Sequence, residues 1–224
     1  MGSFDDLTHI WWPSSNTYIS TSTGASRIFI FDNKTRHGPS NWHSLGAGNQ
    51  ARRGPIFRTH IDQSYAGAVA LLRWLLPGEA DELIKSRWQI INVRHFLMLV
   101  VLPSLGQRTD NRREPQAWRP IKTIYKDPLA VADATTVSEQ DLVPARLVYP
   151  DHERESWTVK SSPSHRWYFK YAQQPNEVLL IKCFDSVSDG KVARRAPHTA
   201  FQNPRHIEEP FRESIEIRTM VFYN

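Results

Sequence analysis

Residues 213–223, with the sequence ESIEIRTMVFY, decide the fold class. The side chains of this stretch alternate in character, which is the period of a β-strand and not of a helix. One face carries Ile215, Ile217 and Thr219, and the other carries Glu216, Arg218 and Met220. Such alternation is typical of a half-buried strand in an antiparallel sheet.

Three more strand-like runs precede this stretch. Residues 165–171, 177–185 and 194–201 are short, rich in aromatic and β-branched side chains, and bounded by Pro, Gly, Asn or Asp. Several strands at this spacing predict a sandwich or a barrel. Helical periodicity is confined to residues 64–76 and 79–87. We therefore expect an α+β fold that is mainly β, with a few flanking helices.

The domain organisation follows from length and from local changes in composition. A chain of 224 residues can bury one sizeable core, which we assign to residues 50–224. Residues 1–49 form a partly irregular N-terminal extension, in which only residues 27–31 predict a strand. Residues 94–117 change from an apolar run to a polar stretch unlike its surroundings, which predicts an inserted segment.

The charge of the chain does not indicate a nucleic-acid partner. The net charge is +5 and the pI is about 9.4, so the chain is basic. Its arginine pairs at 52–53, 112–113 and 194–195 are isolated, and no basic stripe interleaved with aromatic residues joins them. We interpret the excess charge as a solvated surface, or as an attraction for acidic small molecules.

The sequence also predicts where the protein acts. No run of eighteen or more apolar residues is present, which excludes a membrane-spanning helix. Residues 1–8 carry two acidic residues and no basic one, unlike a secretory signal. The single Cys183 lies in an apolar run and predicts a buried, unreactive thiol. We expect a cytoplasmic protein.

His60-Ile61-Asp62 is the first candidate metal-binding motif. On an extended strand, residues two apart point to the same side, so an imidazole and a carboxylate can grip one metal ion. With 9 His and 23 acidic residues, about one such motif is expected by chance, and His206-Ile207-Glu208 is a second. The first follows Gly54-Pro55 and precedes a predicted helix, as at the rim of a barrel, whereas the second lies between prolines and predicts a surface loop.

A complete site needs one more histidine. His198 lies in the strand-like run 194–201, between small and aromatic residues, and is the best candidate. Two imidazoles and one carboxylate leave coordination positions open, which suits Fe(II) that binds a bidentate cosubstrate and then O2. Arg212 and Ser214 share a face at the start of the last strand and offer a guanidinium and a hydroxyl to a second carboxylate. This order is that of 2-oxoglutarate oxygenases on the double-stranded β-helix.

Longer motifs resemble the AsaB-type hydroxylase/desaturase proteins, relatives of the gibberellin desaturase-like and cephem methoxylase-subunit-like proteins. The resemblance covers most of residues 50–224. Its motifs are Arg53-Gly54-Pro55, His60-Ile61-Asp62-Gln63-Ser64, Ile90-Ile91-Asn92-Val93, Trp118-Arg119-Pro120-Ile121, Asp127-Pro128-Leu129-Ala130, Trp167-Tyr168, and residues 177–186, 194–201 and 210–223.

The resemblance implies a non-haem Fe(II) oxygenase of fungal secondary metabolism that uses 2-oxoglutarate and O2 to hydroxylate or desaturate a small molecule. We expect Asn92, Trp118, Arg119, Trp167 and Tyr168 to line its pocket, with core packing as the alternative for each. In the family pattern Asn-Val runs directly into Trp-Arg-Pro, so residues 94–117 are either an inserted loop or a translated intron.

Two other functional classes stay open at this point. The same three ligands could hold Zn(II) with an activated water, as in a hydrolase or isomerase. The barrel could also bind a metabolite or a partner protein without catalysis, as an inactive relative. Arg212 and Ser214 favour the oxygenase, because neither alternative class needs a second carboxylate site.

Overall fold

The computed structural model describes residues 16, 19–45, 53–95 and 123–224. Its strands and helices, in chain order, are β1 (Arg27–Arg36), η1 (Trp42–Leu45), β2 (His60–Ile61), α2 (Tyr65–Leu75), α3 (Ala80–Leu83), β3 (Trp88–His95), β4 (Leu129–Ala132), η3 (Ala134–Thr136), η4 (Glu139–Asp141), β5 (Leu142–Val148), β6 (Glu153–Val159), β7 (Trp167–Phe169), β8 (Leu179–Asp185), β9 (His198–Ala200), η5 (Pro204–His206) and β10 (Ser214–Phe222).

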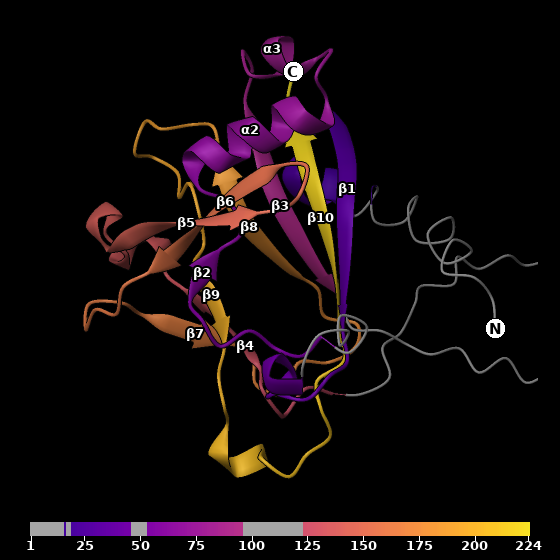
Figure 1. Cartoon of the computed structure of the whole chain (residues 1–224), viewed down its shortest axis with the longest axis vertical. Helices are drawn as coiled ribbons and strands as arrows, with labels where there is room; N and C mark the ends of the chain where they lie inside the picture. Colours follow the sequence, from indigo (N-terminus) through magenta and orange to yellow (C-terminus); the bar gives the residue numbers. More distant parts are fainter. Residues whose placement is uncertain (1–15, 17–18, 46–52, 96–122) are drawn as a thin grey trace, which may run out of the picture.

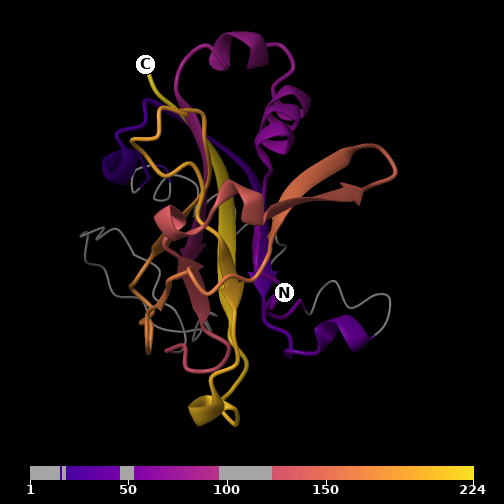
Figure 2. The same cartoon turned by 90° about the vertical axis from the view of Figure 1, so that its left-hand side faces the viewer.

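Two antiparallel sheets face each other (Figure 1). One has the strand order β1-β10-β3-β8, and the other has the order β5-β6-β2-β9-β4-β7. Apart from the β5–β6 hairpin, neighbouring strands are not consecutive in sequence, and the chain crosses repeatedly between the two sheets. Helices α2 and α3 lie toward one end of the molecule, and the β5–β6 hairpin extends away from the body (Figure 2). This is the double-stranded β-helix that the sequence predicts.

The alternation of residues 213–223 is confirmed, but both faces of β10 are buried. Ile217 and Val221 pack in one apolar cluster on the outer face of the sheet, and Met220 and Phe222 pack in the main core. On the inner side, Glu216 is only 2% exposed. The charged face of this strand therefore points into the protein and not to solvent, contrary to the half-buried strand that we expected.

Helix α2 is attached to the second sheet through its first turn. Ser64 caps the helix, and its Oγ accepts a hydrogen bond from the Gly67 backbone N–H at 2.8 Å. The Ser64 N–H donates to the Glu155 carbonyl of β6 at 2.9 Å, and the Ser64 hydroxyl donates to the Glu155 carboxylate at 2.5 Å. These bonds fix the turn that follows β2, and Asp62 lies in that turn.

Replacing Gly67 with alanine is expected to destabilise the fold by about 2 kcal/mol, because overpacking of a filled site costs roughly 1–3 kcal/mol. A Cβ at this position would lie 2.3 Å from the Glu155 carbonyl oxygen. That clash outweighs the gain in helix propensity of about 1 kcal/mol. The free energy of unfolding, measured by urea titration, is the readout.

Gly78→Ala is the matched control for this substitution. A Cβ at Gly78 meets no atom within 4 Å, so its effect should stay within about 0.5 kcal/mol. If Gly67→Ala proved as stable as the wild type, the close packing of α2 on β6 would be wrong.

The predicted elements are confirmed with altered lengths. The helix over 64–76 is α2, but the predicted helix over 79–87 shrinks to the four residues of α3. The extended segment between Pro55 and Asp62 forms a strand only at His60–Ile61, which is β2, although the Ile56 carbonyl also accepts a hydrogen bond from the Ala200 N–H at 2.8 Å. The β5–β6 hairpin was not predicted, because β5 contains Pro144, which argues against a strand, and β6 begins with three charged residues. Apart from Arg94 and His95, whose backbone continues β3, residues 94–117 lie outside the described residues.

No helix among the described residues has the length and apolar character needed to span a membrane.

Candidate metal centre

Strand pairing brings the two predicted histidines together. His60 on β2 lies directly opposite His198 on β9, although the two residues are 138 positions apart in the sequence. Their ring centroids are 4.5 Å apart, and both residues are buried. Residues that pair directly across an antiparallel ladder have side chains on the same face of the sheet. The register therefore places both imidazoles at one point on the inner face.

Each imidazole is oriented by a backbone carbonyl. The Nδ1 atom of His60 lies 2.7 Å from the Arg58 carbonyl oxygen, and the Nδ1 atom of His198 lies 3.0 Å from the Ala196 carbonyl oxygen. A carbonyl can only accept a hydrogen bond, so Nδ1 carries the proton in each neutral ring. Each Nε2 then has a lone pair for a metal ion, as is usual for histidine ligands.

Asp62 completes the cluster. Its Oδ1 lies 3.8 Å from the His60 Nε2, and its Oδ2 lies 3.8 Å from the His198 Nε2. One ligand atom from each residue lies within 4.8 Å of the other two, and no other group of His, Cys, Asp or Glu among the described residues meets this criterion. Two neutral imidazoles and one carboxylate are a donor set that fits a divalent first-row metal ion.

The carboxylate of Asp62 is held by groups of the opposite sheet. Arg218 on β10 donates from Nη2 to Asp62 Oδ1 at 3.1 Å, and its Nε donates to Glu216 at 2.8 Å. Asn92 on β3 donates from Nδ2 to Asp62 Oδ2. Burial is the largest single influence on the pKa of Asp62 and raises it, but Arg218 and the two histidines together bring it below its usual value, so the carboxylate is ionised as a metal ligand requires.

Cys183 on β8 lies beside this cluster. Its Sγ is 3.7 Å from Asp62 Oδ2. Burial raises the pKa of the thiol, and the charges of Asp62 and Glu216 raise it further. The thiol is therefore protonated and acts as a weak donor, and its buried position confirms the prediction for Cys183.

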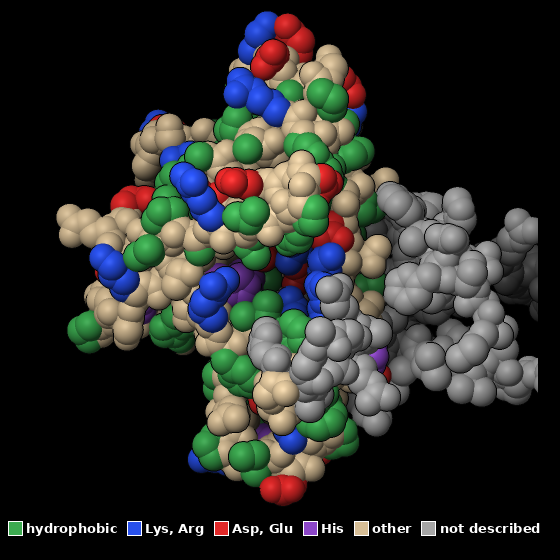
Figure 3. Space-filling model, in the orientation of Figure 1, with side chains coloured by type: hydrophobic (Ala, Val, Ile, Leu, Met, Phe, Trp, Pro, Cys, Tyr) green, Lys and Arg blue, Asp and Glu red, His purple; other side chains and the backbone are tan. Residues whose placement is uncertain are grey.

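A cavity of about 450 Å³ opens onto the cluster. Its lining includes His60, Asp62 and Arg218 together with apolar side chains of β1, α2 and the β5–β6 hairpin. Figure 3 shows the hollow near the centre of one face, with histidine, basic and acidic side chains gathered in it. Among the described lining residues, the cationic ones are Lys34, Arg36, Arg53, Arg58, Arg154 and Arg218, and the acidic ones are Asp32, Asp62 and Glu155.

The two residues of the predicted carboxylate clamp are buried near the start of β10. Arg212 and Ser214 are both buried, and the Arg212 Nη1 donates to the Asp127 carbonyl at 2.8 Å. Ser214 shares the inner face of β10 with Arg218, four residues away or about 13 Å along the strand. Neither residue lines the cavity directly, whereas Arg36, which pairs with Ser214 across β1 and β10, does.

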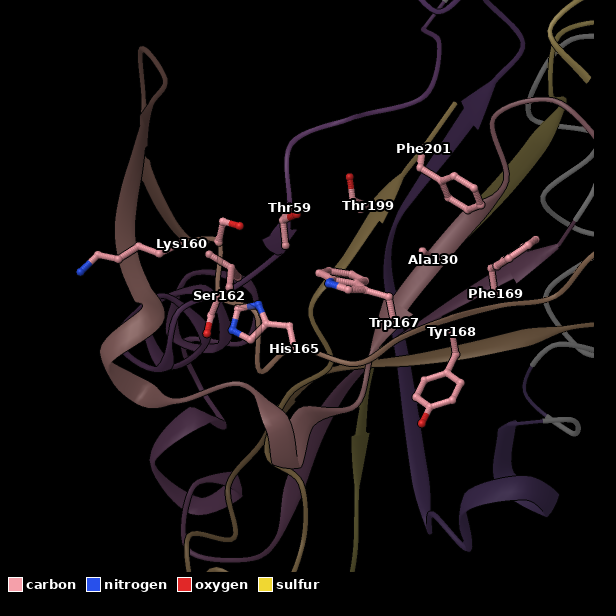
Figure 4. Close-up of a pocket in the computed structure, with 12 residues that line it drawn as sticks. Thr59, Ala130, Lys160, Ser162, His165, Trp167, Tyr168, Phe169, Thr199 and Phe201 are labelled. Carbon is pink, nitrogen blue, oxygen red and sulfur yellow. The ribbon is translucent and has the colours of Figure 1, made fainter. Parts of the chain in front are cut away.

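The other predicted pocket residues are separated by the structure. Asn92 is fully buried behind Asp62. Tyr168 pairs with Val131, which pairs with His198, so Tyr168 shares the face of the histidines. Trp167 lies on the opposite face and lines a second cavity of about 490 Å³ with Phe169 and Phe201. Tyr168 also contributes to the lining of this cavity, but Figure 4 shows its ring directed away from that of Trp167. Trp118 and Arg119 lie outside the described residues.

The second motif, His206-Ile207-Glu208, gathers no metal ligands. His206 ends the short helix η5, and its Nε2 lies 3.0 Å from the Tyr171 hydroxyl. It belongs to no cluster of potential ligands within the described part of the chain. The prediction of a surface loop at this motif is confirmed.

Sequence reasoning missed Arg218, Glu216 and Cys183 as neighbours of the site. Arg218 and Glu216 occupy the polar face of residues 213–223, which the alternation assigns to solvent. The available signal was their spacing. Glu216 and Arg218 continue the inner-face series that begins at Ser214, which had already been assigned to the ligand site.

Comparisons with known proteins agree with this geometry. Residues 3–101 and 111–222 match the family described as "Oxidoreductase/YMDC permease-like domain". The hydroxylase/desaturase asaB of Aspergillus flavus is 35% identical over 184 residues, which cover 75% of this chain and 70% of asaB. The chain belongs to the AsaB-type hydroxylase/desaturase family. The unmatched residues 102–110 fall within the predicted insertion.

Two further proteins are similar to this chain, one in sequence and one in fold. The alpha-ketoglutarate-dependent dioxygenase phiK of a fungal species is 27% identical over 215 residues, covering 95% of this chain and 69% of phiK. The solved structure of the iron and alpha-ketoglutarate-dependent endoperoxidase NvfI superposes with a TM-score of 0.75 at 24% identity, covering 98% of this chain and 72% of NvfI. The chain thus spans about 70% of the length of asaB, phiK and NvfI.

Proposed function

We propose that this oxidoreductase is a non-haem Fe(II), 2-oxoglutarate-dependent dioxygenase that hydroxylates or desaturates a small molecule of secondary metabolism. The observation that carries the proposal is the meeting of His60, Asp62 and His198, with both Nε2 lone pairs and an ionised carboxylate directed at one point beside a cavity. Three ligands on one side leave the cavity side of the metal for a bidentate cosubstrate and O2.

Three groups of residues would have separate roles in this reaction. His60, Asp62 and His198 would hold Fe(II), and the metal with 2-oxoglutarate and O2 would supply the oxidising power. Arg212 and Ser214 would bind the far carboxylate of 2-oxoglutarate, because a guanidinium and a hydroxyl satisfy a buried carboxylate. The basic residues that outnumber the acidic ones around the cavity favour entry of this dianion.

The cavity supports a small organic substrate. Beside its charged residues it is lined by Phe31, Trp42, Leu71, Trp74, Leu75 and Tyr149. Apolar and aromatic walls of a cavity of this size are typical of small-molecule sites. We also propose that the protein acts in the cytoplasm, because a single buried Cys183 without a disulfide is usual in reducing compartments.

The test is the conversion of 2-oxoglutarate by the purified full-length chain. We expect succinate only when Fe(II) and O2 are both present, at a rate that metal chelation abolishes. Replacement of Fe(II) by Zn(II) under nitrogen should give no turnover. If a hydrolysable substrate turned over under nitrogen with Zn(II), the site would belong to a hydrolase, and a folded chain that bound no metal would be a non-enzymatic barrel.

A further inference from the structure

We propose that Arg218 is a positioning residue for the metal centre. Together with Asn92, it fixes the direction of the Asp62 carboxylate, so that the ligand set is formed before the metal binds. This inference rests on the proposed function, since it assigns Arg218 a role toward the metal site. Arg218 touches the carboxylate and not the site between the three ligands.

The position of Asp62 in the fold explains why it needs such support. Strand β2 ends at Ile61, so the sheet fixes His60 through its pairing but does not fix Asp62. The Asp62 side chain points across the barrel to the opposite sheet. Its direction therefore depends on what that sheet presents.

The opposite sheet presents one row of polar side chains. Asp32, Arg218 and Asn92 pair across β1, β10 and β3 and so lie side by side on the inner face. Arg218 donates to Asp62 Oδ1 at 3.1 Å, and Asn92 donates to Asp62 Oδ2. Arg218 thus supports Oδ1, and Asn92 supports Oδ2 together with the weakly donating Cys183 thiol, while each oxygen lies 3.8 Å from one imidazole Nε2. Rotation of the carboxylate would break both supporting bonds at once.

Arg218 is itself held in place by other carboxylates. Its Nε donates to Glu216 at 2.8 Å, and its Nη1 lies 3.9 Å from Asp32. One planar guanidinium therefore contacts three carboxylates through three different nitrogens. A lysine ammonium keeps the charge but cannot reproduce this fork. The geometry needs an arginine at position 218 and not merely a positive charge.

A merely structural ion pair is the alternative, and the chain contains one for comparison. Arg87 donates from Nε to Asp185 Oδ1 at 3.3 Å and from Nη2 to Asp185 Oδ2 at 2.9 Å. Asp185 is fully buried. It pairs with Gln89 near the start of β3, three residues along the strand from Asn92. Arg87→Lys therefore removes a guanidinium fork from a buried carboxylate in the same sheet without touching Asp62.

The experiment compares metal affinity in Arg218→Lys, Arg87→Lys and the wild type. Mn(II) alone is titrated into each folded protein, and free Mn(II) is followed by electron paramagnetic resonance. We expect the Kd to rise about tenfold in Arg218→Lys, in the range of 10–100-fold found when groups that orient metal ligands are lost. Arg87→Lys should bind with the affinity of the wild type. In Arg218→Met, provided that circular dichroism shows a folded protein, the Kd for Mn(II) should rise about 100-fold.

Each outcome bears on the proposal separately from the proposed function. Wild-type affinity in Arg218→Lys would overturn the positioning role, and so would an equal loss in Arg218→Lys and Arg87→Lys, which would indicate a general effect of stability. Urea unfolding of the metal-free variants measures that stability directly. A folded wild-type chain that bound no Mn(II) would instead overturn the proposed metal site itself, and Arg218 with it.

Discussion

His60→Ala is expected to abolish binding of Fe(II). The Kd should rise by at least about 100-fold, which exceeds the loss of affinity when only a group that orients a metal ligand is removed. Asp62 and His198 would be left as the only ligands from the described residues. Two ligands rarely hold Fe(II) against water, because the ion keeps its hydration when the protein replaces too few positions. Formation of succinate should fall to background in the same variant.

His206→Ala is the matched control. His206 also begins a His-x-carboxylate motif, but it lies on η5 beside Tyr171 and Glu209, and it belongs to no group of three potential ligands among the described residues. Its removal should leave both the iron stoichiometry and the rate unchanged. Iron content measured on anaerobically loaded, desalted protein distinguishes the two variants. Full iron content in His60→Ala would refute the metal site, and a loss in His206→Ala would show that the wrong motif had been chosen.

Arg212→Ala is expected to raise the KM for 2-oxoglutarate by about 30-fold or more, while the affinity for Fe(II) stays at the wild-type value. Loss of one partner of a buried charge pair costs roughly 2–5 kcal/mol, and 2 kcal/mol is about a 30-fold change. Arg212 is 3% exposed and lies on the polypeptide just before β10, so its charge is shielded from water. Succinate formation over a range of 2-oxoglutarate concentrations gives the KM.

The controls for this substitution separate binding from folding. Arg212 donates to the Asp127 carbonyl at 2.8 Å, so its loss also removes a structural bond. Arg212→Lys keeps the charge and should give an intermediate KM. Ser214→Ala removes only a hydroxyl and should have a smaller effect. An unchanged KM in Arg212→Ala would transfer the role to Arg36, which is buried, lines the cavity and pairs with Ser214.

Much of the fold could be predicted because its signals are local. The alternation of residues 213–223 reflects the period of a strand, and Ser64 at the start of an apolar periodic run marks the beginning of α2. The β5–β6 hairpin was missed for the opposite reason. Strand β5 contains Pro144 and leaves most of its apolar side chains exposed, while β6 begins with three charged residues and buries only two side chains. Neither strand therefore shows the alternation of a half-buried strand, and their mutual pairing is not displayed by a single sequence.

The candidate site divides along the same line. His60 and Asp62 were predicted from a spacing of two, and His198, Arg212 and Ser214 from their order along the chain. The point where His60 and His198 meet is fixed by the pairing of β2 with β9, which is a contact between distant segments of the chain. Trp167 and Tyr168, adjacent in sequence, fall on opposite faces of β7, and only the register of the sheet decides which of them shares the face of the histidines.

By itself, the sequence determined the types of chemical group available and the local elements that carry them, because side-chain chemistry and backbone period are properties of neighbouring residues. Only the tertiary structure decided which charges are buried together. Glu216 and Arg218 look like a solvated face in the chain, yet the second sheet covers them and brings Asp62 to 3.1 Å from Arg218. Burial and long-range contact depend on the packing of the two sheets, and no local pattern encodes the position of the opposite sheet.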